Sequence, residues 1–173
     1  MPEMLRHNDG KLRYSLLPTS WIRLLMNNPL GRLTQETLRV LDYGASKYSP
    51  NNWRVSGSWT KVYDSLLRHV VAYSKGEQLD PESGLSHLGH MGANLAFLHE
   101  FEEQNNGIDD RYCVGRNRNY EELVDLHEHN FHRPFIHILA ALDGGSVAEA
   151  IDALDEYCEG LPKTTLLQQL RLF

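Results

Sequence analysis

Apolar residues recur at helical spacing in three successive segments of the chain. Thr34 is expected to cap a helix that runs to Lys47, and Ser58 to cap one that runs to Lys75. The second of these helices is apolar on two sides, which is typical of a helix covered by two neighbours. Asp80 followed by Pro81 predicts the start of a third helix that ends near residue 104. No segment alternates with the period of a strand, so the sequence predicts an all-α fold, a helical bundle.

Glycine, proline and asparagine mark the interruptions. Residues 1–20 are expected to form an irregular arm, residues 20–28 a short helix, and residues 49–59 a loop. A second loop over 105–119 is the predicted boundary between a helical domain, 1–105, and a C-terminal helical extension, 106–173. In the extension, capping boxes predict helix starts near 120 and 147. Residues 135–142 and 147–159 are then expected to pair as a hairpin, with a last short helix over 163–173.

The charge of the chain is unevenly distributed. Its net charge is −6, and 41% of its residues are hydrophobic. Residues 1–75 carry 11 basic and 5 acidic side chains, whereas residues 76–173 carry 6 and 18. A basic half suits a small anion such as a phosphate, and the acidic half argues against a long nucleic-acid footprint. With no long apolar run and two cysteines outside any metal-binding spacing, we expect a cytoplasmic protein without a membrane partner.

The segment 80–103 carries the most specific chemical pattern. His87, His90 and Asn94 are spaced three and four residues apart, which places them on one stripe of a helix. Two imidazoles one turn apart can bind one metal ion, although a hydrogen-bonded pair in the core has the same spacing. Glu82 is expected in the first turn of the same helix, where it reaches such an ion by the curvature of that turn or through water. His69, on the preceding helix, is consistent with either a core side chain or a catalytic one.

Several other residues are suited to holding a nucleotide. Charged and hydrogen-bonding side chains bind phosphate, and an aromatic ring packs against a base. Arg68 serves this purpose or forms an ordinary ion pair with Asp64, one helical turn earlier. The remaining candidates are Lys11, Arg13, Lys47, Tyr48, Asn52, Trp53, Arg54 and Asn94.

Four blocks in a fixed order resemble a known family. They are GKLRYSLLP at 10–18, LDYGASKYSPNNW at 41–53, YDSLLRHVVAYSKGE at 63–77 and DPESGLSHLGHMGANLAFLHEFE at 80–102. Together they are similar to the N-terminal domain of the dATP/dGTP diphosphohydrolases, the MazZ-type enzymes related to MazG. The resemblance covers about the first hundred residues and leaves 106–173 unassigned.

The resemblance implies an all-α enzyme that uses a divalent metal to convert a deoxynucleoside triphosphate to the monophosphate and pyrophosphate. MazG relatives carry Glu-x-x-Asp followed by Asn on one helix, and here His87, His90 and Asn94 fall on that pattern. The paired-glutamate motif expected on the preceding helix is not present near His69. Mg²⁺ prefers oxygen ligands, whereas imidazoles favour Mn²⁺, Co²⁺ or another transition ion.

We therefore expect a rebuilt metal site and hydrolysis of a purine deoxynucleotide. The expected metal ligands are His87, His90, Glu82 and Glu36, with Asp64 as a further candidate, and the cation is Mn²⁺, Co²⁺ or Mg²⁺. Glu82 and His69 are the predicted catalytic residues. A nucleotide-binding or sensing module without turnover is the alternative, and an HD-type phosphohydrolase is disfavoured because the chain has no His-Asp dipeptide. The doubly apolar second helix also predicts a homo-oligomer, a dimer or tetramer.

Overall fold

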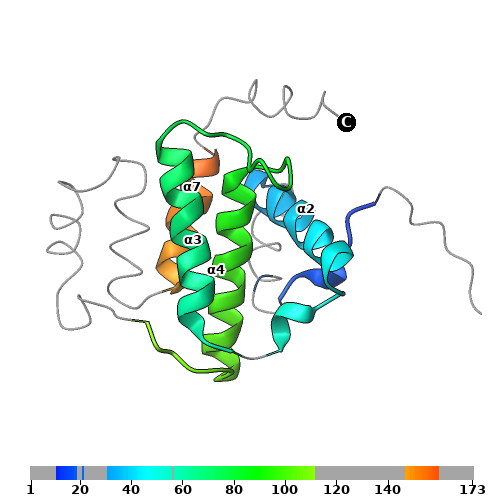
Figure 1. The fold of residues 1–173 in the computed structure, drawn as a ribbon, viewed down its shortest axis with the longest axis vertical. Helices are drawn as coiled ribbons and strands as arrows, with labels where there is room; N and C mark the ends of the chain where they lie inside the picture. The colour runs from blue at the N-terminus through cyan, green and yellow to red at the C-terminus, as the bar shows by residue number, and fades with distance from the viewer. Residues whose placement is uncertain (1–10, 19–20, 22–30, 56, 112–146, 160–173) are drawn as a thin grey trace, which may run out of the picture.

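The computed structural model describes residues 11–18, 21, 31–55, 57–111 and 147–159. Within these ranges the regular elements are all helical, and strand-like pairing is confined to isolated bridges. Figure 1 shows the arrangement, in which α3 and α4 lie side by side with α2 and α7 beside them. The α-helices are α2 (Arg32–Lys47), α3 (Trp59–Ser74), α4 (His87–Gln104) and α7 (Val147–Glu159), and the 3-10 turns are η1 (Tyr14–Leu16) and η2 (Asn52–Arg54). The predicted all-α fold is confirmed.

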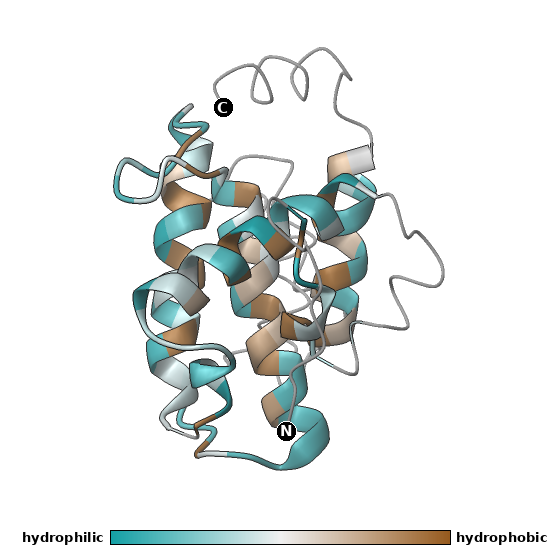
Figure 2. Ribbon diagram, turned by 90° about the vertical axis from the view of Figure 1, so that its right-hand side faces the viewer, coloured by the Kyte–Doolittle hydropathy of each residue, from teal (hydrophilic) through white to brown (hydrophobic). Residues whose placement is uncertain are grey.

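Helix α4 is the centre of the bundle. It packs against α2, α3 and α7, and twelve of its residues are buried. Figure 2 shows apolar stretches in brown on each of the helices, alternating with teal polar positions. Two glycines allow the closest approach of α2, because a Cβ atom at Gly89 would lie 2.6 Å from the carbonyl oxygen of Glu36 and one at Gly92 would lie 2.1 Å from Thr37 Oγ1. The position of α4 against α2 therefore depends on these two small residues.

The described part of the N-terminal arm, residues 11–18, packs against the core, although its sequence predicts only an irregular segment. Leu16 and Leu17 are buried in the core together with Trp21. The guanidinium of Arg13 forms an ion pair with the Asp42 carboxylate and donates a second hydrogen bond, from Nη2 to the Asp42 carbonyl at 3.3 Å. The buried leucines and the ion pair of Arg13 thus fasten this segment to the core and to α2.

The segment 105–111 closes the lower end of α3 in the view of Figure 1. Asp110 accepts hydrogen bonds from the Ser58 hydroxyl at 2.7 Å and from the backbone N–H of Thr60 at 2.9 Å. The indole of Trp59 donates to the carbonyl of Asn106 at 2.8 Å, and Arg111 stacks over the same indole ring. Asp110 supplies the N-terminal cap of α3, since the Ser58 side chain makes no cap bond of its own.

The predicted helix start at Asp80 is wrong, because α4 begins seven residues later, at His87. The Asp80 carboxylate accepts from the backbone N–H of Ser83 and closes a turn, and Gly84 adopts a left-handed φ of +70° that a helix interior does not allow. Ser86 caps α4 instead, because its side chain accepts from the N–H of Leu88. Glu82 therefore lies on a loop and not in a first helical turn. At the start of α2, Gly31 takes the N-cap position that was predicted for Thr34.

Helix α7 belongs to the segment predicted as a separate extension, yet it packs against α2 and α4. It contributes five buried residues to the common core, namely Val147, Ala150, Ile151, Leu154 and Cys158. The division at 105 stays a prediction. Apart from Trp21, the helices expected over 20–28, 120–133, 135–142 and 163–173 lie outside the described residues. Among the described helices, none is long and apolar enough to cross a membrane.

Candidate metal and nucleotide site

A cavity of about 600 Å³ opens between the C-terminal end of α2, the turn η2, helix α3, the loop 77–86 and helix α4. Apolar side chains such as Val40, Leu41 and Phe97 form part of its wall, and ionisable side chains gather at one part of it. This combination of a concave, partly apolar wall and a few convergent polar groups is typical of a small-molecule site.

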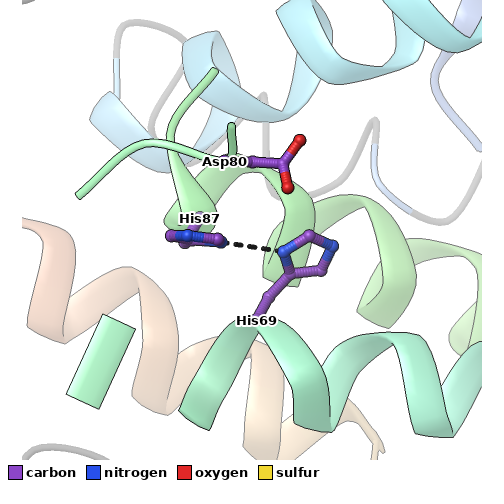
Figure 3. Close-up of side chains that lie close together, drawn as sticks. All are labelled: His69, Asp80 and His87. Atoms are coloured by element: carbon purple, nitrogen blue, oxygen red, sulfur yellow. Dashed lines mark hydrogen bonds between the residues drawn. The ribbon is translucent and has the colours of Figure 1, made fainter. Parts of the chain in front are cut away.

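Three of the polar side chains meet in one cluster. His69 comes from α3, His87 from the first residue of α4, and Asp80 from the loop that joins these helices. One potential ligand atom from each lies within 4.8 Å of the others. Figure 3 shows the two imidazoles edge to edge, with the carboxylate beside them. We call these three residues the cation cluster.

The geometry of the cation cluster fits a divalent ion. The Nδ1 atoms of His69 and His87 are 2.9 Å apart. Two nitrogens that bind one ion at right angles and at about 2.1 Å lie about 3 Å apart, so this spacing suits a shared ion as well as a hydrogen bond. Two imidazoles and one carboxylate are a donor set for Mn²⁺, Co²⁺, Fe²⁺ or Zn²⁺. His87 is only 2% exposed, and its Nε2 has no hydrogen-bond partner among the described residues.

Ser83 fixes the carboxylate of the cluster. Both its backbone N–H and its hydroxyl donate to Asp80 Oδ2, at 2.9 and 2.8 Å. The same hydroxyl oxygen lies 2.8 Å from Nε2 of His90, so that an N–H there donates to Ser83 while Ser83 donates to Asp80. His90 itself stacks on His69, with ring centroids 4.3 Å apart, and the Asn94 amide donates to the His90 carbonyl. His90 thus lies directly beside the cluster, and its predicted role as a ligand stays a prediction.

The electrostatics keep these groups in their cation-binding forms near neutral pH. Burial, together with the neighbouring histidines, lowers the pKa of His69 to about 4. Burial also lowers the pKa of His87 and of His90, against the attraction of Asp80. Burial opposes the ionisation of Asp80. The two hydrogen bonds from Ser83 and the attraction of the histidines together outweigh this effect, so the pKa of Asp80 is lowered. Neutral imidazoles and a charged carboxylate are the forms that bind metal.

The mouth of the cavity is charged and aromatic. Lys47, at the end of α2, forms an ion pair with Glu82, and this hydrogen-bonded pairing raises the pKa of Lys47. The Lys47 ammonium also lies 5.3 Å from the ring of Tyr48, which is 67% exposed. Arg68 adds a positive charge to the wall, and among the described residues it forms no ion pair with Asp64. These side chains form a rim that suits phosphate and an aromatic ring.

Trp53 lines the cavity, and its ring is held by two neighbouring side chains. Its indole stacks on Phe97 at 4.7 Å with an interplanar angle of 19°, and the guanidinium of Arg54 lies 4.7 Å from the same ring. Arg54 is also held by Glu100, with Nη1 and Oε1 3.2 Å apart. Trp53 therefore forms part of the cavity wall, while Tyr48 and the exposed Asn52 offer the open surface.

Most of the predicted site residues come together. The cavity is lined by ten of them, namely Lys47, Tyr48, Asn52, Trp53, Arg68, His69, Glu82, His87, His90 and Asn94. Lys11, Arg13 and Glu36 do not line it. Arg13 is engaged with Asp42, and Glu36 is buried in an ion pair with Arg32 whose Nε and Oε1 are 2.9 Å apart.

Three residues of the site were missed from sequence, Asp80, Ser83 and Glu77. Asp80 was interpreted as a helix cap because it precedes a proline. The signal that identifies it as a turn residue is Ser83 and Gly84, three and four positions later, since that pattern favours a side-chain-closed turn over a first helical turn. Glu77, which follows the helix-ending Gly76, gave no signal, because its place beside His87 is a tertiary contact.

Comparison with known proteins places the chain in a family. A family model described as dATP/dGTP diphosphohydrolase, N-terminal, matches residues 2–111. A dATP/dGTP diphosphohydrolase of Salmonella phage PMBT28 is 34% identical over 80 residues, which are 46% of this chain and 27% of the relative. The match thus spans little more than a quarter of that relative's length. No solved structure matches the chain.

Proposed function

The chain belongs to the dATP/dGTP diphosphohydrolase N-terminal family, and we propose that it hydrolyses a purine deoxynucleoside triphosphate to the monophosphate and pyrophosphate with the help of a divalent cation. The observation that carries this proposal is the cation cluster of His69, Asp80 and His87 in the wall of a cavity that also holds Lys47 and Arg68. A cation cluster next to basic side chains is what a triphosphate with its metal requires.

The cation cluster would hold the ion. A bound divalent ion neutralises phosphate oxygens and lowers the pKa of water, which is the chemistry that phosphoanhydride hydrolysis needs. The two imidazoles, neutral at pH 7, offer lone pairs, and Asp80, oriented by Ser83, offers negative charge. We favour Mn²⁺ or Co²⁺ over Mg²⁺, since two of the three ligands are nitrogens.

The rest of the cavity would bind and orient the nucleotide. Lys47 and Arg68 are suited to the phosphates, because each carries a positive charge into the cavity. Tyr48 and Asn52 are suited to the base, one by its exposed ring and the other by its amide. Glu82 is released from Lys47 when the ammonium turns to phosphate, and it then becomes the carboxylate that accepts a proton from the attacking water. Asn94 lines the same cavity, and its amide is suited to contact the sugar.

The test is a panel of dATP, dGTP, their ribose counterparts and the pyrimidine deoxynucleotides, each with Mn²⁺, Co²⁺ or Mg²⁺. The products are separated by ion-exchange chromatography. We expect a deoxynucleoside monophosphate and pyrophosphate, with the purines and the transition ions preferred. Formation of the diphosphate and inorganic phosphate would contradict the proposed bond cleavage.

Matched variants connect the activity to the cluster. His87→Gln should abolish turnover, whereas His99→Gln, a histidine change on the same helix outside the cavity, should not. Nucleotide binding without turnover in the parent protein under all these metals would favour the alternative of a sensing module.

We also propose that the protein forms a homo-oligomer, a dimer or tetramer. Light scattering that gives the mass of one chain would contradict this proposal.

A further inference from the structure

His87 has one ring nitrogen whose role the cation cluster leaves open. Its Nδ1 faces His69, while its Nε2 is buried and has no hydrogen-bond partner among the described residues. A buried polar atom without a partner is rare in a folded protein and calls for an explanation. Among the described residues, the carboxylate nearest to this nitrogen belongs to Glu77, with Oε2 3.9 Å away.

The backbone holds Glu77 next to His87. The N–H of Glu77 donates to the carbonyl of Ala72 at 3.2 Å, which fastens it to the last turn of α3. The N–H of His87 donates to the carbonyl of Gln78 at 3.2 Å, and an isolated bridge joins Leu79 to Ser86. The short segment that carries Glu77 therefore runs beside the first residue of α4, and only the side chain of Glu77, 57% exposed, is left to adjust.

The position of protons on the two imidazoles changes when a cation binds. Without an ion, the 2.9 Å contact between the two Nδ1 atoms requires that one of them donates its proton to the other. When both Nδ1 atoms offer lone pairs to an ion, each ring must carry its proton on Nε2. The Nε2–H of His87 is then a buried donor that needs an acceptor, and a small rotation of the Glu77 side chain supplies one.

We infer that Glu77 is the positioning residue of the cation cluster: its carboxylate accepts the Nε2–H of His87 and thereby fixes the tautomer and ring orientation with which His87 binds the ion. This inference rests on the proposed function, because it assumes that the cluster binds a divalent cation. Carboxylate partners of this kind raise the basicity of a ligating imidazole, and their loss weakens metal binding by about 10–100-fold.

The experiment is a Mn²⁺ titration of the full chain without nucleotide, in which the free ion is followed by electron paramagnetic resonance. We expect Glu77→Gln to raise the Kd for Mn²⁺ by about 10–100-fold. Glu103→Gln removes the same charge from an exposed position near the end of α4 and should leave the Kd unchanged. The melting temperature of the metal-free Glu77→Gln variant should equal that of the parent, because the Glu77 side chain is largely exposed.

Each outcome distinguishes the two proposals. A parent protein that binds no Mn²⁺ would refute the cation cluster and this inference with it. If the parent binds Mn²⁺ and Glu77→Gln binds it with the same Kd, the inference alone is refuted. A loss of affinity matched by Glu103→Gln would reduce the effect to general charge, and a lower melting temperature of the metal-free variant would make Glu77 a structural residue; both would overturn the positioning role.

Discussion

Two aspartates, Asp80 and Asp110, lie in similar surroundings but have different roles. Each lies in a loop, and each accepts a hydrogen bond from a serine hydroxyl, Ser83 in one case and Ser58 in the other. Asp110 uses both of its oxygens for structure, since Oδ2 accepts from Ser58 and Oδ1 from the N–H of Thr60. Asp80 receives both of its hydrogen bonds on Oδ2 and turns toward two imidazoles.

The difference lies in how many bonds the local backbone demands of the carboxylate. At the start of α3, the helix N-terminus presents unpaired N–H groups. Both carboxylate oxygens of Asp110 are engaged there, one by the N–H of Thr60 and one by the Ser58 hydroxyl. At the start of α4, Ser86 already provides the cap. The hydrogen bonds that the Asp80 carboxylate accepts from described residues come from Ser83 and both go to Oδ2, with His90 Nε2 3.7 Å from the same oxygen. A carboxylate that is oriented but not saturated can bind a ligand. We therefore expect the two aspartates to affect different measurements.

The largest expected effect is that of Asp80→Asn on turnover. We expect kcat/KM with a purine deoxynucleotide to fall by about 10²–10³-fold, the scale of removing one electrostatic stabiliser of a transition state. The melting temperature in EDTA should change little, because an amide oxygen can still accept from Ser83. Steady-state kinetics and thermal melts of the same preparations measure both quantities. Equal turnover in parent and variant would exclude Asp80 from the site.

Gly89→Ala is expected to lower the stability of the protein. Gly89 lies on α4, the helix against which α2 and α3 pack, so the loops of both aspartates depend on its position. The added Cβ would lie 2.6 Å from the Glu36 carbonyl oxygen, which belongs to the backbone and cannot rotate away. We expect a net loss of about 1–3 kcal/mol in the free energy of unfolding. Gly44→Ala is the matched control, because its Cβ meets nothing within 4 Å, and a gain of about 0.4–1 kcal/mol is expected. Urea unfolding distinguishes the two.

The two regions should also lose stability in different pH windows. The pKa of His69 is about 4 in the folded protein and 6.5 ordinarily, so the unfolded chain binds the proton first and stability falls as the pH drops from about 6.5 to about 4. The pKa of Asp110 is about 2, below its ordinary value near 3.9, so its contribution is present above about pH 4 and is lost toward pH 2.

Melting temperatures in EDTA between pH 7.5 and 2.5 would resolve these windows. His69→Gln should flatten the upper part of the profile and Asp110→Asn the lower part. If His69→Gln left the decline between pH 6.5 and 4 unchanged, the buried environment assigned to this imidazole would be incorrect.

The smallest expected effect is that of Asp110→Asn at neutral pH. The side chain is exposed, so we expect the melting temperature to fall by only a few degrees through the weakened cap of α3. Turnover and Mn²⁺ affinity should match those of the parent. A strong loss of activity in this variant would mean that the start of α3 contributes to the site, against the separation of the two aspartates.

Helical periodicity was enough to predict the fold and the positions of His69 and His87, but the pairing of these residues was not predicted. Helices α2 and α3 were placed within a few residues of their ends, because their apolar spacing and the stop at Gly76 are local signals. The i, i+3 spacing favoured His90 as the partner of His87 in binding an ion, whereas the Nδ1 atom nearest to that of His87 belongs to His69 on another helix. Contacts between helices depend on packing, which a single sequence does not encode locally.

The loop 77–86 also shows that local sequence signals do not predict tertiary contacts. Its turn geometry depends on Ser83 and Gly84, which local rules can recognise. The consequence of that turn, which brings Asp80 and Glu77 to the two sides of His87, required the positions of α3 and α4. Glu82, one of the carboxylates predicted as a ligand, pairs with Lys47 at the cavity mouth, and its role as a ligand stays a prediction.

The central claim is that His69, Asp80 and His87 bind a divalent cation. It is tested most directly by the position of Mn²⁺ in a crystal of the full chain, located by anomalous diffraction at the manganese edge. We predict a peak bound by Nδ1 of His69, Nδ1 of His87 and a carboxylate oxygen of Asp80, and no such peak in crystals of Asp80→Asn. A manganese peak on Glu82 or Glu36 without these three residues, or a cation cluster that stays empty at millimolar Mn²⁺, would contradict the account.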